Sequence, residues 1–268
     1  METAASHGIF GRVSDPSEQS LHPLVGGFAD AENYDYARPR YGADVVDALK
    51  NALDLRAGSP VLELGAGTGQ LSQALVAGGL ELTAVEPLEE TRVLLGRAIG
   101  PERVRAGVAE DIPLPAQSVE AVLAADSFHW FDQSRALPEI HRVLKPGGGL
   151  AILHSLPLWD GPWITEIGTL LNEARPTHPA YPVFEGLADS ALSEVNGYGP
   201  VRKITVHSEE VTNPARVLAY LASFSWIGSL TEAERESLLG RVAEVLERYE
   251  IGEFPHQVAH IIWVARLR

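Results

Sequence analysis

The stretch Val61-Leu62-Glu63-Leu64-Gly65-Ala66-Gly67-Thr68-Gly69-Gln70 decides the fold of this chain. An apolar run leads into glycines at alternate positions, and a helical pattern follows through Leu75. We therefore expect a buried strand over residues 60–64, a glycine turn and a helix. Glycine adopts positive φ and lets a ligand approach the backbone, so the turn indicates a ligand site.

Gln70, the residue after the third glycine, restricts the class of ligand that the turn can bind. The dinucleotide pattern GxGxxG requires glycine where this chain has Gln70. The phosphate-binding P-loop ends in Gly-Lys-Ser/Thr, and the turn contains no lysine. The turn therefore suits a nucleoside and lacks a pyrophosphate groove.

Strand and helix signals alternate beyond the turn. Strands are expected at 80–86, 103–106, 119–125 and 150–154, with helices at 91–98 and 135–144. The second helix should stop at Lys145-Pro146-Gly147-Gly148, since a cation, a proline and glycines end helices. This alternation predicts an α/β fold with a parallel, doubly wound sheet.

The pattern changes after residue 155. Residues 156–200 are rich in Pro, Trp and Gly, which suits a cap over a pocket. Strands at 201–208 and 258–267 predict an antiparallel closing pair, and Asn213-Pro214 and Thr231 mark helix starts. We expect a flexible tail and lid over 1–42 and one domain over 43–268, with the cap inserted at about 156–200.

Composition excludes several classes of function. The net charge of −15 disfavours a nucleic-acid partner and an anionic membrane surface. Cysteine is absent, and the nine histidines show no metal-ligand spacing, so we expect no metal. Residues 1–20 do not resemble a signal peptide, and no run reaches the ~18 apolar residues of a membrane span. A cytoplasmic location is expected.

Two acids lie at the carboxyl ends of the first two expected strands, Glu63 in the first and Glu86 in the second. Glu86 ends the second strand, where a carboxylate accepts hydrogen bonds from both hydroxyls of a ribose lying over the glycine turn. An exposed acid in a strand-to-helix turn is the alternative. Glu63 is either a plain strand-end acid or the partner of an ammonium group on the ligand.

Four motifs in order carry a family resemblance. Residues 63–69, Glu86, the segment 109–114 (AEDIPL) and the segment 142–148 (RVLKPGG) resemble the successive motifs of class I S-adenosylmethionine-dependent methyltransferases, closest to the ubiquinone/menaquinone-biosynthesis type. Phe28 with residues 34–41 is similar to the amino-terminal lid of small-molecule members. Residues 128–132 (FHWFD) resemble the subgroup that includes trans-aconitate methyltransferases.

The resemblance implies a Rossmann-like sheet of seven strands, S-adenosylmethionine as cofactor and a small-molecule acceptor that is methylated on O, N or C. It implies that Tyr34, Tyr36 and Arg38 close over the methionine end, where Arg38 meets the carboxylate. Many relatives bind the adenine amino group with an acid, where this chain has Val108. The adenine contact is then expected through the Ala109 backbone, with Glu110 or Asp111 in place of the missing side chain. The cofactor-binding candidates are Tyr34, Tyr36, Arg38, Glu63, Gly65, Ala66, Gly67, Gly69, Gln70, Glu86, Pro87, Val108, Ala109, Glu110 and Asp126.

Methyl transfer needs mainly in-line positioning, and a base where the acceptor loses a proton. His129 follows the fourth strand and is the first candidate base; His154, near the end of the fifth, is the second. The alternative for each histidine is a hydrogen-bonded residue of the pocket wall or a packing residue. Aromatic residues after strand ends and in the cap predict an apolar acceptor surface: Trp130, Phe131, Trp159, Trp163, Phe224 and Trp226.

Several alternatives remain open from sequence. A cyclase or pericyclase on this fold binds the same cofactor without methyl transfer, and product mass separates the two. A nicotinamide oxidoreductase is disfavoured by Gln70, and an RNA methyltransferase by the acidic charge. A protein methyltransferase and a cofactor-sensing module without catalysis are further readings. The acceptor and the oligomeric state are not specified.

Overall fold

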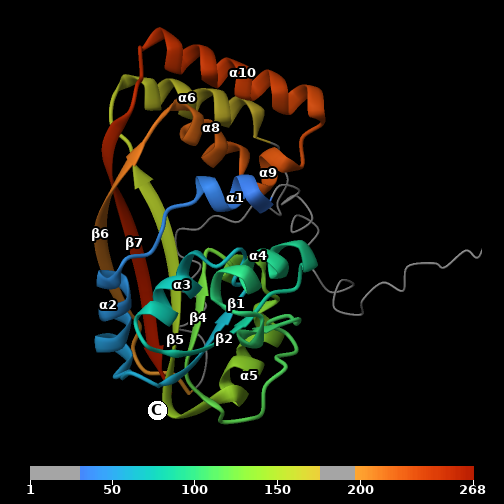
Figure 1. Ribbon diagram of the computed structural model, residues 1–268, viewed down its shortest axis with the longest axis vertical. Coiled ribbons are helices and arrows are strands. Elements are labelled where there is room, and N and C mark those ends of the chain that lie inside the picture. The colour runs from blue at the N-terminus through green and yellow to red at the C-terminus, as the bar shows by residue number, and fades with distance from the viewer. Residues whose placement is uncertain (1–30, 176–196) are drawn as a thin grey trace, which may run out of the picture.

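The computed structural model describes residues 31–175 and 197–268, which contain a seven-stranded sheet (Figure 1). The strand order is β3-β2-β1-β4-β5-β7-β6. The first five strands in this order run parallel, and β7 pairs antiparallel with both β5 and β6. The strands are β1 Pro60–Leu64, β2 Glu81–Val85, β3 Val104–Arg105, β4 Val119–Ala125, β5 Leu144–Leu158, β6 Arg202–Thr212 and β7 Phe254–Arg266. The expected fold, including the antiparallel closing pair, is confirmed.

Helices cover both faces of the sheet, because alternate strand residues point to opposite sides. One face packs on α2 (Ala43–Leu53), α3 (Gln70–Ala77) and α4 (Glu89–Ile99). The other packs on α5 (Gln133–Val143). In β1, Val61 belongs to the first core and Leu62 to the second, and both are fully buried. Two short 3-10 helices, Pro101–Arg103 and Phe128–Trp130, complete the connections.

A third core lies at the carboxyl end of the parallel strands. It joins α6 (Pro162–Ala174), α8 (Pro214–Ala222), α9 (Ser225–Gly228) and α10 (Glu232–Arg248). Side chains of Asn213 and Thr231 cap α8 and α10, as the sequence predicts. In Figure 1 these helices form the upper layer, and α1 (Ala31–Ala37) lies between them and the glycine turn. The structure therefore places a helical layer over the carboxyl edge of the parallel strands.

Several predicted strand boundaries differ from the structure, most of all at β5, while β6 runs on to Thr212 and β7 begins at Phe254. The sequence predicts a helix to Leu144 and a strand from Leu150, but the helix ends at Val143 and β5 spans Leu144–Leu158. Leu144 already pairs with Val119, and the register shifts before Ala121 pairs with Gly149. The upper part of β5 is extended because β7 pairs with it as far as Leu158. Residues 156–158, which the sequence pattern groups with the cap, thus belong to the sheet.

Some predictions fall outside the described residues. These are the tail over 1–30, including Phe28, and the part of the cap segment over 176–196.

Candidate functional site

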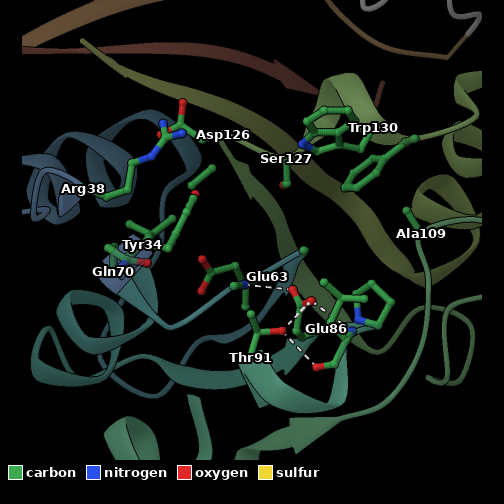
Figure 2. Close-up of a pocket in the computed structure, with 18 of the residues that line it drawn as sticks. Tyr34, Arg38, Glu63, Gln70, Glu86, Thr91, Ala109, Asp126, Ser127 and Trp130 are labelled. Carbon is green, nitrogen blue, oxygen red and sulfur yellow. Dashed lines mark hydrogen bonds between the residues drawn. The ribbon is translucent and has the colours of Figure 1, made fainter. Parts of the chain in front are cut away.

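A cavity opens where β1, β2 and β4 end, below α1 (Figure 2). Most of the predicted cofactor-binding residues line it. The lining consists of Ala31, Tyr34, Arg38, Pro39, Tyr41, Glu63, Gly65, Ala66, Gly67, Gln70, Leu71, Glu86, Pro87, Leu88, Thr91, Gly107, Val108, Ala109, Glu110, Ala125, Asp126, Ser127, Trp130 and Phe131.

The three glycines of the turn have different roles, although all have positive φ. A Cβ on Gly65 would meet Ser127 Cβ at 2.7 Å, so Gly65 permits close packing on the β4 loop. A Cβ on Gly69 would meet Leu95 at 2.9 Å, which lets α3 start against α4. Nothing lies within 3.9 Å of a Cβ on Gly67, because that position faces the cavity. Gly69, a predicted binding residue, is not part of the lining.

Glu86 is buried at the end of β2 and held by three donors. Its Oε2 accepts from the Gly67 amide at 2.9 Å, and its Oε1 accepts from the Leu88 amide at 3.1 Å and the Thr91 hydroxyl at 3.0 Å (Figure 2). Burial raises the pKa of Glu86, and these hydrogen bonds oppose the rise. The carboxylate is therefore fixed in the cavity wall beside the glycine turn.

Glu63 is the second buried acid of the cavity. Its Oε2 accepts a hydrogen bond from the Ser72 hydroxyl of α3. Burial and the nearby charge of Glu86 raise the pKa of Glu63, the Ser72 hydrogen bond lowers it, and the net value is about 8. At neutral pH this acid is mainly protonated until a cation pairs with it.

Residues of and after α1 form the roof of the cavity. Arg38 Nε donates to the Ser223 hydroxyl at 3.0 Å, and Arg38 Nη2 donates to the Ser223 carbonyl at 3.2 Å. Its guanidinium lies over the rings of Tyr34, Tyr220 and Phe224, at 4.8, 5.3 and 5.6 Å from their centroids. Arg38 thereby joins the roof to the helical layer above it.

Of two further predicted cofactor-binding residues, Gln70 lines the cavity and Tyr36 does not. Gln70 Nε2 donates to Asp35 at 3.1 Å and to Thr68 at 2.7 Å, so it ties α3 to α1 where a dinucleotide fold has glycine. Tyr36, predicted to contact the cofactor, is 51% exposed and lies outside the lining.

The expected adenine segment lines the opposite end of the cavity. Val108, Ala109 and Glu110 all belong to the lining, with Gly107 beside them. Glu110 accepts a hydrogen bond from the Asp132 amide at 2.6 Å, which fixes this loop to the start of α5.

Asp126, directly after β4, contacts His154 within the neighbouring β5. His154 Nδ1 lies 2.5 Å from Asp126 Oδ1. Tyr41 donates to Asp126 Oδ2 at 3.4 Å, and the Ser155 amide donates to Oδ1 at 3.4 Å. Asp126 has φ 51°, a left-handed conformation that is uncommon outside glycine.

The predicted acceptor residues separate into two groups. Trp130 and Phe131 line the cavity itself. Trp159, Trp163, Phe224 and Trp226 belong to the core of the helical layer. His129 lies in the 3-10 helix with its ring 4.4 Å from that of Trp130, and neither it nor His154 lines the cavity.

Sequence reasoning missed part of the lining. Ala125 and Ser127 flank Asp126, so their position after a strand end was a usable signal. Pro39 and Tyr41 lie within the lid motif of residues 34–41, but neither was named as a candidate. No local signal marked the others, which are Ala31, Leu71, Leu88, Thr91 and Gly107.

Two classes of site do not occur among the described residues. No group of three or more acids and histidines is arranged to hold a metal ion. No helix in the same part of the chain combines the length and apolar character needed to cross a membrane.

Comparisons with known proteins agree with this geometry. A family model described as a methyltransferase domain matches residues 62–152. An uncharacterized methyltransferase of Mycobacterium tuberculosis is 33% identical over 216 residues, covering 80% of this chain and 82% of its own. An uncharacterized methyltransferase-like protein of Schizosaccharomyces pombe is 31% identical over 81% of this chain and 84% of its own.

A solved structure shares the fold. A protein of Anaeromyxobacter dehalogenans, provisionally assigned as a type II methyltransferase, superimposes with a TM-score of 0.62 at 26% identity and covers 86% of this chain and 97% of its own. The chain belongs to the class I S-adenosylmethionine-dependent methyltransferases.

Proposed function

We propose that the cavity binds S-adenosylmethionine and that the enzyme transfers its methyl group to a small-molecule acceptor. The observation that carries this proposal is the buried Glu86 carboxylate beside Gly67, at the end of β2. A nucleoside needs an open approach to the backbone and an acceptor for its ribose hydroxyls, and Gly67 and Glu86 supply them. The residues therefore fit the cofactor.

We infer the direction of the cofactor from the cavity lining. With the ribose on Glu86, the base would lie toward residues 107–110 and the amino-acid end toward Glu63 and α1. Glu63 would pair with the α-ammonium group, and Arg38 with the α-carboxylate. Tyr34 and Gln70, in the same part of the lining, would close the roof over this end.

The chemistry asks the protein for positioning. The cofactor supplies a methyl group on a sulfonium, which is already an activated electrophile. The chain must hold the acceptor in line with the carbon–sulfur bond and keep water out. Trp130 and Phe131 offer apolar surface at the cavity. His129 and His154, which lie outside its lining, are the candidate bases.

We propose a small molecule as the methyl acceptor for two further reasons. The motif resemblance favours the ubiquinone/menaquinone-type and trans-aconitate-type subgroups, whose members act on small molecules. The net charge of −15 supports a small acceptor over a nucleic acid, and we propose that the enzyme acts in the cytoplasm.

Two measurements test the proposal. S-adenosylhomocysteine should raise the melting temperature, because a ligand that binds the native state stabilises it by mass action, whereas NAD should not. Incubation of cell extracts with methyl-labelled S-adenosylmethionine should yield small products that gain one labelled methyl. Stabilisation by NAD alone, or a labelled protein or RNA fraction without small products, would contradict the proposal.

A further inference from the structure

The acceptor has a defined side of the cavity if the proposed function is correct. The cofactor would lie over β2, β1 and β4, with its methionine end toward β4. The next strand in the sheet is β5, and ligands of open α/β sheets bind at the carboxyl ends of strands. The acceptor is therefore expected beside β5, just past the carboxyl end of β4 and below the helical layer.

His154 is the polar residue that the sheet places at this point. Ala125, the last residue of β4, pairs with Leu153, so His154 is the first residue of β5 beyond β4. Its imidazole Nδ1 lies 2.5 Å from Asp126 Oδ1, and Asp126 itself lines the cavity. A carboxylate bonded to Nδ1 fixes the tautomer and leaves Nε2 as the basic ring atom.

A network of hydrogen bonds supports the pair Asp126–His154, which is called the dyad below. Asp126 is held by the Tyr41 hydroxyl and the Ser155 amide, both at 3.4 Å. Ser155 Oγ lies 2.8 Å from His260 Nδ1, and Ser208 Oγ lies 2.8 Å from His260 Nε2. Ser155 and His260 are buried, so the network anchors the dyad across β5, β7 and β6. A left-handed Asp126 is a strained conformation of the kind found at functional sites.

We propose that His154, oriented by Asp126, accepts the proton that the acceptor loses on methylation. The acceptor is then a small molecule that reacts through a hydroxyl, phenol or amine. A carboxylate is ionised at neutral pH and needs no base. This inference rests on the proposed function and adds a catalytic residue and a substrate class to it.

The step balances as a displacement. A lone pair of the acceptor oxygen or nitrogen forms the new bond to the methyl carbon, and the carbon–sulfur bond breaks with its electron pair passing to sulfur. The O–H or N–H proton moves to His154 Nε2. S-adenosylhomocysteine and the methylated product leave, and the imidazolium returns its proton to water.

The charges around the dyad set its pH dependence. Burial lowers the pKa of His154, but the hydrogen bond and charge of Asp126 outweigh it, and the pKa is raised above 6.5; Arg38 opposes this rise. Burial raises the pKa of Asp126, yet His154, Arg38 and His129 lower it overall, so the carboxylate stays ionised. His154 is the neutral base only above its raised pKa, and the rate should therefore increase with pH through that value.

Nitrogen NMR of the full chain with S-adenosylhomocysteine tests the dyad without an acceptor. We expect the Nδ1–H tautomer at high pH, with Nε2 titrating above pH 6.5, and a lower pKa in Asp126→Asn. A dominant Nε2–H tautomer, or a pKa unaffected by Asp126→Asn, would overturn the proposal. His207→Gln, at an exposed position of β6, is the matched control and should leave the His154 resonances unchanged.

The labelled product and the pH–rate profile test the catalytic role. The methyl should be found on an oxygen or nitrogen that carried a proton. With that acceptor, His154→Gln should lower kcat about 10²–10⁴-fold, with KM little changed, and should lose the ionisation seen above pH 6.5 in wild type and in His207→Gln. A methyl ester as the sole product, or an ionisation retained in His154→Gln, would overturn the proposal.

The two proposals fail in different ways. Absence of S-adenosylhomocysteine binding, or of any methylated product, would contradict the proposed function. Binding of S-adenosylhomocysteine with methylation that is independent of His154 would overturn the dyad alone.

Discussion

The carboxylate of Glu63 accepts a hydrogen bond from the Ser72 hydroxyl, and both residues are buried, at 1% and 0% exposure. The bond joins the end of β1 to the first turn of α3, so it lies directly behind the glycine turn. Burial nevertheless raises the pKa of Glu63 to about 8. The site thus holds a protonated acid where the proposed cofactor carries an ammonium group.

Cofactor binding should therefore release a proton. Near pH 7 an ammonium paired with Glu63 stabilises the carboxylate, so S-adenosylhomocysteine affinity should rise by up to about tenfold per pH unit below pH 8. Calorimetry in buffers of different ionisation enthalpy measures the released proton. The same proton release in Glu63→Gln would assign it to another group.

The free protein should lose stability with rising pH because of the same acid. The folded pKa of about 8 exceeds the ordinary 4.5, so the native state binds more protons than the unfolded chain in this window. The free energy of unfolding should fall by at most about 1.4 kcal/mol per pH unit between pH 4.5 and 8. Urea unfolding of Glu63→Gln should show a flatter profile, whereas Glu89→Gln, at an exposed site, should retain the wild-type slope.

Removal of the ribose acceptor should weaken cofactor binding. Glu86→Gln keeps the shape of the side chain but loses charge-assisted hydrogen bonds, which should cost about 2–3 kcal/mol of S-adenosylhomocysteine affinity. Glu90→Gln, exposed on α4, serves as the control. Calorimetry at pH 7.5 makes the comparison, and equal affinities would place the nucleoside elsewhere.

The sequence predicted the parallel core because its signals are local. The glycine turn, Glu86 and the apolar β4 each report their own environment within a few residues. The upper part of β5 was not predicted, because residues 155–158 are strand only through pairing with β7, more than 90 residues away. Long-range pairing leaves no mark in a short window of sequence.

The candidate site also combines residues that local sequence predicts with contacts that depend on strand pairing. Most predicted cofactor residues line the cavity, since strand ends and glycine turns locate them. The Asp126–His154 contact depends on the register between β4 and β5, which no local sequence pattern predicts. Tyr36 and Arg38 are two residues apart, yet one is exposed and the other is held by Ser223, because the turn of α1 separates their directions.

Alanine at Gly65 should destabilise the fold more than alanine at Gly147. Both glycines have positive φ, at 63° and 76°, so each substitution carries backbone strain of about 1–2 kcal/mol. Only at Gly65 does the added Cβ also meet Ser127 at 2.7 Å, whereas nothing lies within 4 Å at Gly147. Overpacking should add about 1–3 kcal/mol. Urea unfolding of the two variants measures the difference, and equal losses would mean that the β4 loop moves freely.

Arg38 should hold α1 against α8. Its hydrogen bonds to Ser223 and its position over three aromatic rings should contribute about 2 kcal/mol to this contact. Arg38→Gln should therefore speed amide hydrogen exchange in residues 31–38 and 214–222 by roughly 30-fold, while β1 and β4 remain protected. Arg40→Gln is the matched control, because Arg40 pairs with Asp35 at an exposed site. Exchange measured by mass spectrometry should separate the two variants. Equal protection of α1 in Arg38→Gln and Arg40→Gln would show that apolar packing alone holds the roof.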